Sequence, residues 1–530
     1  MRSIDYAAAY PSARSPVFGR DVIATSHPLA SQAGMAMLAQ GGNAVDAVVA
    51  AAMALTVVEP TGCGIGSDAF AIVWDGAALH GLNSSGRSPA TWTPERFAGL
   101  DSMPERGWDA VTVPGAVAAW VELARRFGRL DLEKLAAPAI RFAREGFAVT
   151  PIVATQWRRA GVLLADQPGF AACFLPDGRA LDAGELFRSE AHARTLESIA
   201  GSGGEAFYRG ELAHAMVADA GRHGGAMTLD DLAAHSADWV GTLSHAYAGA
   251  VVHELPPNGQ GIATLIALGI MQALGNGGGV DDPETVHLAI EATKLAMVDL
   301  DQHLADPEAM TVSAASLLDP SYVARRARLV DPARASDPGH GTPGPGGTVC
   351  LAAGDRDGTM ISFIQSNYMG FGSGVVVPDT GISLQNRGAG FTLRAGHANR
   401  VGPRKRPFHT IIPGFALDGD GSPLLAFGLM GGPMQAQGHL QLALRMLAHR
   451  QDPQAAADAP RWRVLSGRRV AVEPGMDPHL VQALRERGHE IVVEPTDEMF
   501  AFGGAQVVQR TAAGYVAGSD PRKDGQALAW

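Results

Sequence analysis

The feature that most constrains the fold is an abrupt change in the sequence at Thr348. The segment before it, 337–347, reads DPGHGTPGPGG, and this density of proline and glycine excludes a central strand and predicts a loop. The residues after it read TVCLAA, GDRDG and TMISFIQS, which predicts two strands joined by a tight turn. Folding this hairpin brings Thr348 close to Gln365 and Ser366. A hydroxyl side chain therefore lies where a loop becomes a rigid strand, with a second hydroxyl beside it.

Such a junction suits self-cleavage between Gly347 and Thr348. Gly347 has no side chain, so its carbonyl can be held in a strained conformation and attacked by the neighbouring hydroxyl. Cleavage would leave Thr348 with a free α-amine, which can act as the base for its own hydroxyl. The alternative is an ordinary structural loop before a strand, which Gly-Gly-Thr sequences commonly form.

A second glycine pair, Gly431-Gly432, lies between the apolar run 424–429 and a predicted helix. Unhindered backbone N–H groups at such a position can stabilise a developing oxyanion, and the alternative is a plain tight turn. The glycine-rich segment 62–66 (GCGIG) lacks the GxGxxG spacing of a dinucleotide loop. The glycine pair therefore enters the list of candidate site residues, and segment 62–66 does not.

The composition limits the partners. The chain has 530 residues and a formal net charge of −12, which argues against nucleic acid or an anionic membrane as the main partner. Three scattered cysteines make neither a disulfide framework nor a zinc site, and the histidines lack metal-ligand spacing. We therefore expect no metal, no cofactor and a small-molecule substrate. The first residues lack the apolar core of a secretory signal, which predicts a cytoplasmic protein.

The periodicity predicts an α+β fold. Paired strands are expected near 70–74 and 77–82, and strands dominate beyond Thr348. Helices are expected at 29–40, after the capping residue Asn43, and at 118–127, 132–143, 262–274, 284–303 and 437–449. There is no regular βαβ alternation and no internal repeat, so a layered α+β architecture is favoured.

The chain resembles the γ-glutamyltransferase (γ-glutamyltranspeptidase) family of Ntn hydrolases. The resemblance runs from about Ala24 to Trp530 and rests on motifs that include ATSHPLASQAG, GGNAVDAVVAAAMALTVVEPTGCGIGSDAF, TVPGAVAAW, PPNGQG, GFGSG, GISLQN, GPRKRP and SDPR. It implies a four-layer αββα sandwich formed jointly by two halves of a self-cleaved chain. The halves would be a helix-rich large subunit, 1–347, with a Pro/Gly tail at 335–347, and a strand-rich small subunit, 348–530. The two subunits would form a heterodimer, and the resemblance leaves open whether several heterodimers assemble into a larger homo-oligomer.

The resemblance also implies an activity and roles for residues. Thr348 matches the family nucleophile, Ser366 the residue that hydrogen-bonds it, and Gly431 and Gly432 the oxyanion-hole glycines. The leading implied function is hydrolysis of γ-glutamyl compounds such as glutathione, with transpeptidation as a second outcome.

The matched substrate-binding positions depart from the family pattern. Ser85 stands where the family has an arginine that binds the substrate α-carboxylate, with Arg87 two residues on. Tyr368 replaces an asparagine. The glutamine and aspartate that hold the α-amine fall on Arg387 and Gly390, and the paired serines near the carboxylate fall on His409 and Thr410.

Losing an acid and gaining Arg387 disfavours an ammonium group in the pocket. We therefore expect Arg87, Arg387 and His409 to converge on a carboxylate. This leaves two alternatives to the γ-glutamyl reading: an amidohydrolase of a dicarboxylic monoamide without an α-amine (glutaryl-type or oxamate-like), and a non-cleaving, non-catalytic binding protein.

Overall fold

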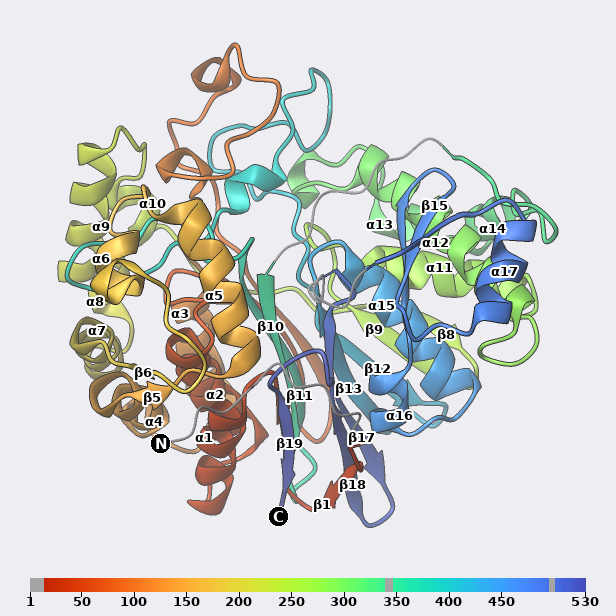
Figure 1. Ribbon diagram of the computed structural model, residues 1–530, viewed down its shortest axis with the longest axis horizontal. Coiled ribbons are helices and arrows are strands. Elements are labelled where there is room, and N and C mark those ends of the chain that lie inside the picture. The colour runs from red at the N-terminus through yellow and green to blue at the C-terminus, as the bar shows by residue number, and fades with distance from the viewer. Residues whose placement is uncertain (1–13, 339–346, 495–500) are drawn as a thin grey trace.

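Two seven-stranded sheets lie face to face at the centre of the structure (Figure 1). The computed structural model describes residues 14–338, 347–494 and 501–530. The sheet that carries Thr348, here called the nucleophile sheet, has the order β19 (Gln526–Ala529), β2 (Val22–Thr25), β10 (Gly347–Gly354), β11 (Met360–Tyr368), β3 (Asp68–Trp74), β4 (Leu79–Ser84) and β7 (Asp238–Trp239). The second sheet has the order β1 (Val17–Gly19), β18 (Gly514–Ser519), β17 (Gly504–Thr511), β13 (Pro423–Met430), β12 (Gly414–Asp418), β9 (Ala250–Glu254) and β8 (Leu243–Tyr247).

Two smaller sheets lie outside this pair. One joins β14 (Trp462–Ser466), β15 (Arg469–Val472) and β16 (Glu490–Val493), and the other joins β5 (Phe147–Ala148) and β6 (Leu186–Phe187).

An apolar core joins the two large sheets. Phe70 and Ile364 of the nucleophile sheet are buried in one cluster with Phe415 and Val508 of the second sheet. Side chains alternate between the faces of a strand, so the same strands send their other residues towards the helices. Both sheets are therefore buried on both faces.

Helices cover the outer face of each sheet (Figure 1). On the side of the nucleophile sheet lie α1 (Pro28–Ala39), α2 (Ala44–Val58), α3 (Ala116–Phe127), α4 (Leu132–Glu145), α5 (Pro151–Leu164), α6 (Phe170–Phe174), α7 (Glu190–Gly201), α8 (Glu205–Tyr208), α9 (Glu211–Arg222) and α10 (Leu229–Ala233). On the other side lie α11 (Gly261–Ala273), α12 (Pro283–His303), α13 (Ala314–Leu317), α14 (Pro320–Ala327), α15 (Met434–Ala443), α16 (Pro453–Asp458) and α17 (Pro478–Glu486). The expected α+β class is confirmed.

Helix α2 shows why the sequence folds this way around the nucleophile. Every residue from Ala44 to Val58 is buried, because the helix packs between α1, α4 and strands β10 and β11. Asn43 caps its start: the Asn43 side chain accepts from the Asp46 N–H, and the Asp46 carboxylate accepts from the Asn43 N–H.

The predicted hairpin is confirmed in its register. Val349 pairs with Gln365 and Leu351 with Phe363, so Thr348 lies opposite Ser366. The helix expected at 437–449 begins earlier, at Met434, and continues into a π-helical turn at Leu444–Ala448. Of the predicted Pro/Gly tail, residues 339–346 lie outside the described residues.

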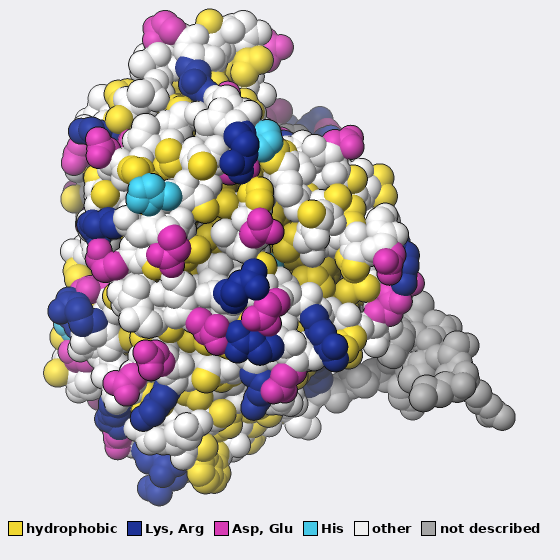
Figure 2. All heavy atoms as spheres, turned by 90° about the vertical axis from the view of Figure 1, so that its left-hand side faces the viewer, with side chains coloured by type: hydrophobic (Ala, Val, Ile, Leu, Met, Phe, Trp, Pro, Cys, Tyr) yellow, Lys and Arg dark blue, Asp and Glu magenta, His cyan; other side chains and the backbone are white. Residues whose placement is uncertain are grey.

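Charges of both signs are interspersed on the face of the helical layer in Figure 2. Arg144 of α4, for example, pairs with Glu190 and Glu197 of α7. Within the described ranges, no helix has both the length and the apolar character needed to cross a bilayer.

Candidate active site

Two hydroxyl side chains meet at the end of the β10–β11 hairpin. The Oγ1 atom of Thr348 lies 3.0 Å from the Oγ atom of Ser366, and both side chains are buried. The Tyr368 backbone N–H donates to Ser366 Oγ at 2.7 Å, which fixes the second hydroxyl. Because this oxygen accepts from an amide, its own hydroxyl can donate to Thr348 Oγ1. The structure therefore places the candidate nucleophile and the candidate positioning residue in direct contact.

The candidate oxyanion glycines follow directly after strand β13. Gly431 and Gly432 have φ angles of +127° and +60°, a region that favours glycine, so a side chain at either position would be strained. The Gln260 side chain donates to the Gly432 carbonyl at 2.9 Å, and the Met434 N–H donates to the Gly431 carbonyl at 3.2 Å. These contacts hold the backbone of the pair, as a preorganised oxyanion site requires.

Gln435, which is not among the residues predicted from the sequence, connects this glycine pair to the nucleophile. It is buried in the first turn of α15, with Nε2 at 3.5 Å from Thr348 Oγ1. Its Oε1 atom accepts from the Ile412 N–H at 3.0 Å, which fixes the amide. The only signal in the sequence was an amide side chain just after the Gly-Gly pair.

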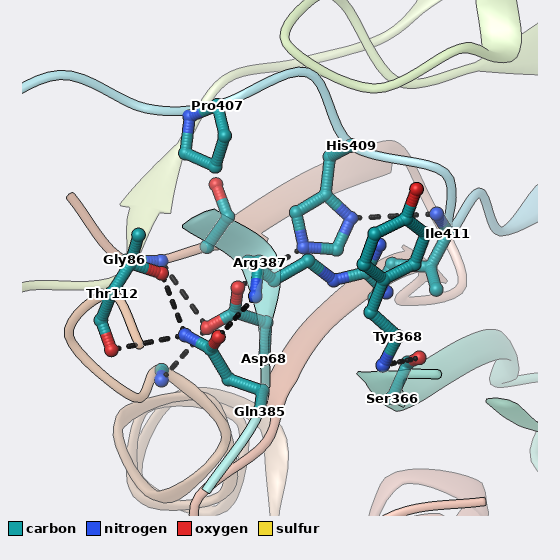
Figure 3. Close-up of polar contacts among 12 residues, drawn as sticks. Asp68, Gly86, Thr112, Ser366, Tyr368, Gln385, Arg387, Pro407, His409 and Ile411 are labelled. Carbon is teal, nitrogen blue, oxygen red and sulfur yellow. Dashed lines mark hydrogen bonds and ion pairs between the residues drawn. The ribbon is translucent and has the colours of Figure 1, made fainter. Parts of the chain in front are cut away.

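Arg387 is a buried charged residue beside Tyr368, the residue whose backbone N–H donates to Ser366 (Figure 3). Its guanidinium lies over the Tyr368 ring at 4.5 Å, and Nη1 donates to Thr410 Oγ1 at 2.8 Å. The Arg387 side chain is only 1% exposed, and its Nε and Nη2 atoms find no hydrogen-bond partner among the described residues. Burial lowers the pKa of Arg387 to about 10, so it stays charged at neutral pH.

The backbone around Arg387 is held from two directions. Gln385 accepts from the Arg387 N–H at 2.5 Å through Oε1, and its Nε2 donates to Thr112 Oγ1 at 2.6 Å (Figure 3). Tyr368 has a φ of +78°, which is uncommon for a residue with a side chain and frequent at functional sites.

Gln260 ties the two ends of the site together. Its Nε2 atom donates both to the Thr410 carbonyl at 2.5 Å and to the Gly432 carbonyl at 2.9 Å. The side-chain amide of Gln260 therefore links Thr410, which contacts Arg387, to Gly432, which would stabilise the oxyanion.

His409 pairs with Asp68, an acid that is also not among the residues predicted from the sequence. The His409 Nε2 atom lies 3.1 Å from Asp68 Oδ2, and both side chains are fully buried. The Ile411 N–H points at His409 Nδ1 at 3.4 Å, so Nδ1 accepts and Nε2 carries the proton given to Asp68. Both ring nitrogens are therefore engaged within the protein, so neither is left over for the substrate carboxylate that His409 was expected to bind.

The environment of this pair shifts both pKa values. Burial raises the pKa of Asp68 to about 7, although Arg387 and the Gly86 and Gly115 amides oppose the shift. Burial lowers the pKa of His409 well below its ordinary value, and the charge of Arg387 acts in the same direction. The sequence signal for Asp68 was an acid at the first position of the otherwise apolar strand β3.

Three other candidates have different surroundings from those expected. Arg87 is not part of the expected convergence, because Nη1 pairs with Asp306 Oδ2 at 3.1 Å and its side chain is 37% exposed. Ser85 is buried and donates to Asn83 Oδ1 at 2.8 Å. An ideal Cβ at Gly390 would lie 2.5 Å from the Phe408 carbonyl oxygen, so no side chain fits there without backbone movement.

The part of the site around Arg387, Tyr368 and His409 is here called the acyl end. A cavity of about 440 Å³ adjoins it at Tyr368. Tyr368 and Gly390 line it, together with apolar residues such as Leu300 and Phe391 and polar residues such as Asp301, Arg394 and His397. It provides space for part of a substrate next to Tyr368.

One cluster outside this site has the composition of a metal site. His287, Glu291 and His489 bring their ligand atoms within 4.8 Å of one another. The two imidazoles, however, hydrogen-bond directly to each other at 2.8 Å. Lys294 Nζ forms an ion pair with Glu291 Oε1 at 2.7 Å. An ammonium in contact with the carboxylate opposes a cation, so we assign no metal to this cluster.

The comparisons with known proteins agree with this geometry. The Gamma-glutamyltranspeptidase family profile matches residues 30–530. The chain belongs to this family. It is accordingly an enzyme of the γ-glutamyltranspeptidase family, a hydrolase, and its structural neighbours are Ntn hydrolases.

Relatives within the family carry different names. An oxamate amidohydrolase proenzyme of Klebsiella pneumoniae is 38% identical, over 95% of this chain and 97% of its own. A glutathione hydrolase-like YwrD proenzyme of Bacillus subtilis is 36% identical, over 97% of this chain and 99% of its own. The crystal structure of cephalosporin acylase from Bacillus halodurans superimposes with a TM-score of 0.95 at 47% identity, covering 100% of this chain and 99% of that one. The family is therefore established, and the substrate class within it is not.

Proposed function

We propose that this protein is a self-processing N-terminal-threonine amidohydrolase whose preferred acyl group carries a carboxylate and no neighbouring ammonium, as in glutaryl-type or oxamate-like amides. One observation carries the proposal. The Arg387 guanidinium is buried over the ring of Tyr368, whose backbone N–H donates to Ser366, and two of its nitrogens have no partner among the described residues. A buried guanidinium in this state favours a ligand carboxylate, which it binds through paired hydrogen bonds.

Processing comes first. Thr348 Oγ1 attacks the Gly347 carbonyl carbon, the Gly347–Thr348 amide bond breaks, and the Thr348 nitrogen takes up the proton that the hydroxyl loses. Water then hydrolyses the resulting ester. This yields fragments 1–347 and 348–530, which we expect to stay together in one αββα sandwich because strands β2 and β3 of the first fragment flank β10 and β11 of the second.

Turnover uses the group that processing creates. The new α-amine, with an ordinary pKa of about 7.7–8.0, takes the proton from Thr348 Oγ1 as the oxygen attacks the substrate amide. The Gly431 and Gly432 N–H groups stabilise the oxyanion, and the amine leaves with a proton. Water then releases the acid from the acyl-enzyme.

The pocket is poorly suited to an ammonium group. Arg387 would repel it, and an acid cannot be placed at Gly390 without moving backbone. Asp68 does not substitute for that acid, since the Gly86 and Gly115 amides and His409 already donate to its two oxygens at 3.1–3.2 Å.

A second candidate is hydrolysis of γ-glutamyl compounds such as glutathione. It is favoured by the family to which the chain belongs and by the printed name of the YwrD relative. It requires that another group, supplied by a rearrangement of the pocket, holds the α-amine.

Steady-state kinetics on three p-nitroanilides separates the candidates. The glutaryl compound has the carboxylate alone, the γ-glutamyl compound has carboxylate and ammonium, and the pentanoyl compound has neither. We expect kcat/KM to be highest for the glutaryl compound, by at least about tenfold over each of the others, which corresponds to about 1.4 kcal/mol. Efficient turnover of the γ-glutamyl compound with none of the glutaryl one would establish the second candidate instead.

A further inference from the structure

Asp68 and His409 form a rigid unit against the acyl end of the site (Figure 3). The Gly86 and Gly115 N–H groups hold Asp68 Oδ1 at 3.2 and 3.1 Å, and His409 holds Oδ2. The His409 ring packs against Phe70 at 4.7 Å between centroids, which fixes its plane. Neither side chain has exposed surface, so water does not screen their charge.

Charge balance in this pocket changes when a substrate binds. In this pocket the positive Arg387 and the negative Asp68 attract each other, and Arg406, which also acts on Asp68, is already paired with Asp238 at 2.9 Å. An acyl carboxylate beside Arg387 would bring a second anion into the same buried volume. Two anions sharing one cation without solvent is costly, and such sites commonly respond by holding a proton.

We propose that the Asp68–His409 pair takes up one proton when an acyl carboxylate binds beside Arg387, which makes Asp68 a positioning and specificity-determining residue for anionic acyl groups. This inference rests on the proposed function, because it requires the carboxylate to bind at Arg387. The proton belongs to the pair, since a proton added to either member redistributes across the 3.1 Å contact between them.

The charged groups around the pair set the range in which it titrates. Arg387 and Arg406 act on both members, and Tyr208 lies within electrostatic reach of Asp68. The pKa of Asp68 in the empty pocket is about 7, and an added anion would raise it further. The sign follows: a group whose pKa rises on binding favours binding at low pH, so affinity for the carboxylate is lost as the pH rises through about 7.

The molecule contains a matched pair that lacks the guanidinium. Glu254 at the end of β9 lies 2.7 Å from His439 Nδ1, both side chains are fully buried, and the Leu429 N–H donates to the other ring nitrogen at 3.2 Å. The His439 ring also packs against a phenylalanine, Phe427, at 4.9 Å. Burial raises the pKa of Glu254 as it does that of Asp68. Glu254→Gln is therefore the control for Asp68→Asn.

Titration calorimetry of the processed enzyme tests the inference. The ligand is 5-oxohexanoate, a glutaryl-amide analogue in which a methyl ketone replaces the amide, so that it carries one carboxylate and is not hydrolysed. Titrations near pH 8 in buffers of different ionisation enthalpy give the number of protons taken up. We expect wild type and Glu254→Gln to take up nearly one proton more than Asp68→Asn.

Each outcome is decisive. Equal proton uptake by wild type and Asp68→Asn would overturn the inference and leave the proposed function intact. No binding of 5-oxohexanoate to wild type at any pH would overturn the proposed function, and the inference with it. If Asp68→Asn does not fold, wild type decides alone: the affinity should weaken by up to about tenfold per pH unit above the pKa of the free pair. A flat pH profile would overturn the inference.

Discussion

The nucleophile end and the acyl end of this site are built from different kinds of structure. At the nucleophile end, Thr348 and Ser366 lie on adjacent strands, and one hydrogen bond of 3.0 Å joins them. At the acyl end, Arg387 begins a single 3₁₀ turn, His409 lies in an extended loop that bridges to Gly259, and Asp68 is the first residue of its strand. Strand register fixes the first arrangement, whereas the second depends on buried charges that loops bring together. The chemistry can therefore stay constant while the acyl group that is recognised changes.

Removing the nucleophile should have the largest effect. We expect Thr348→Ala to remain one chain without amidase activity, because both processing and turnover need the hydroxyl. Denaturing electrophoresis and p-nitroaniline release measure the two. The control, Thr348→Ser, keeps a hydroxyl and should still be cut, more slowly. A cut or active Thr348→Ala protein would remove Thr348 from the nucleophile end.

The next largest effect should come from the acyl end. Arg387→Gln removes the buried positive charge and should lower kcat/KM for glutaryl-p-nitroanilide roughly 30- to 1000-fold. This corresponds to a loss of about 2–4 kcal/mol of transition-state stabilisation. The rate of self-cleavage should change much less, because the Gly347 carbonyl does not use this pocket. Equal losses for the glutaryl and pentanoyl compounds would mean that Arg387 is structural and recognises no carboxylate.

Ser366→Ala should reduce both processing and turnover. The variant loses one oriented hydrogen bond to Thr348, which is worth roughly 1–3 kcal/mol, or about 5- to 150-fold in rate. Loss at the nucleophile end should be the same for every acyl group, so the ratio of the glutaryl to the pentanoyl rate should not change. A changed ratio would show that the two ends are not separable.

The smallest effect should come from Arg87→Gln. Its partner Asp306 is buried but the Arg87 side chain is 37% exposed, so the pair is partly screened and contributes less than about 1 kcal/mol. We expect kcat/KM for the glutaryl compound to change by less than about fivefold. A loss as large as that of Arg387→Gln would restore Arg87 to the acyl pocket.

Local sequence was sufficient to predict the nucleophile end. The Pro/Gly run, the GDRDG turn and the two apolar segments fix the β10–β11 register, and hence the contact of Thr348 with Ser366. Arg387 was placed by resemblance to a family. Both predictions used either the residues of one short segment or the match of that segment to a family motif.

The contacts that were missed are long-range. Asp68 and His409 are 341 residues apart, and Gln435 is 87 residues from Thr348. Arg87 was expected in the pocket and instead meets Asp306, 219 residues away. No local sequence pattern indicates which distant segment a buried charged residue will contact. The charge pairs at the acyl end could therefore be identified only from the three-dimensional structure. The predicted subunit boundary and the cytoplasmic location stay predictions.

Trapping the acyl-enzyme would identify the nucleophile and the preferred acyl group in one experiment. Processed enzyme is mixed with glutaryl- or γ-glutamyl-p-nitroanilide, quenched in acid and digested with trypsin, and the peptide 348–356 (TVCLAAGDR) is examined by mass spectrometry. We expect a glutaryl group on Thr348 in this peptide and little γ-glutamyl adduct. An acyl group on any other residue, or a γ-glutamyl adduct that forms while the glutaryl one does not, would contradict it.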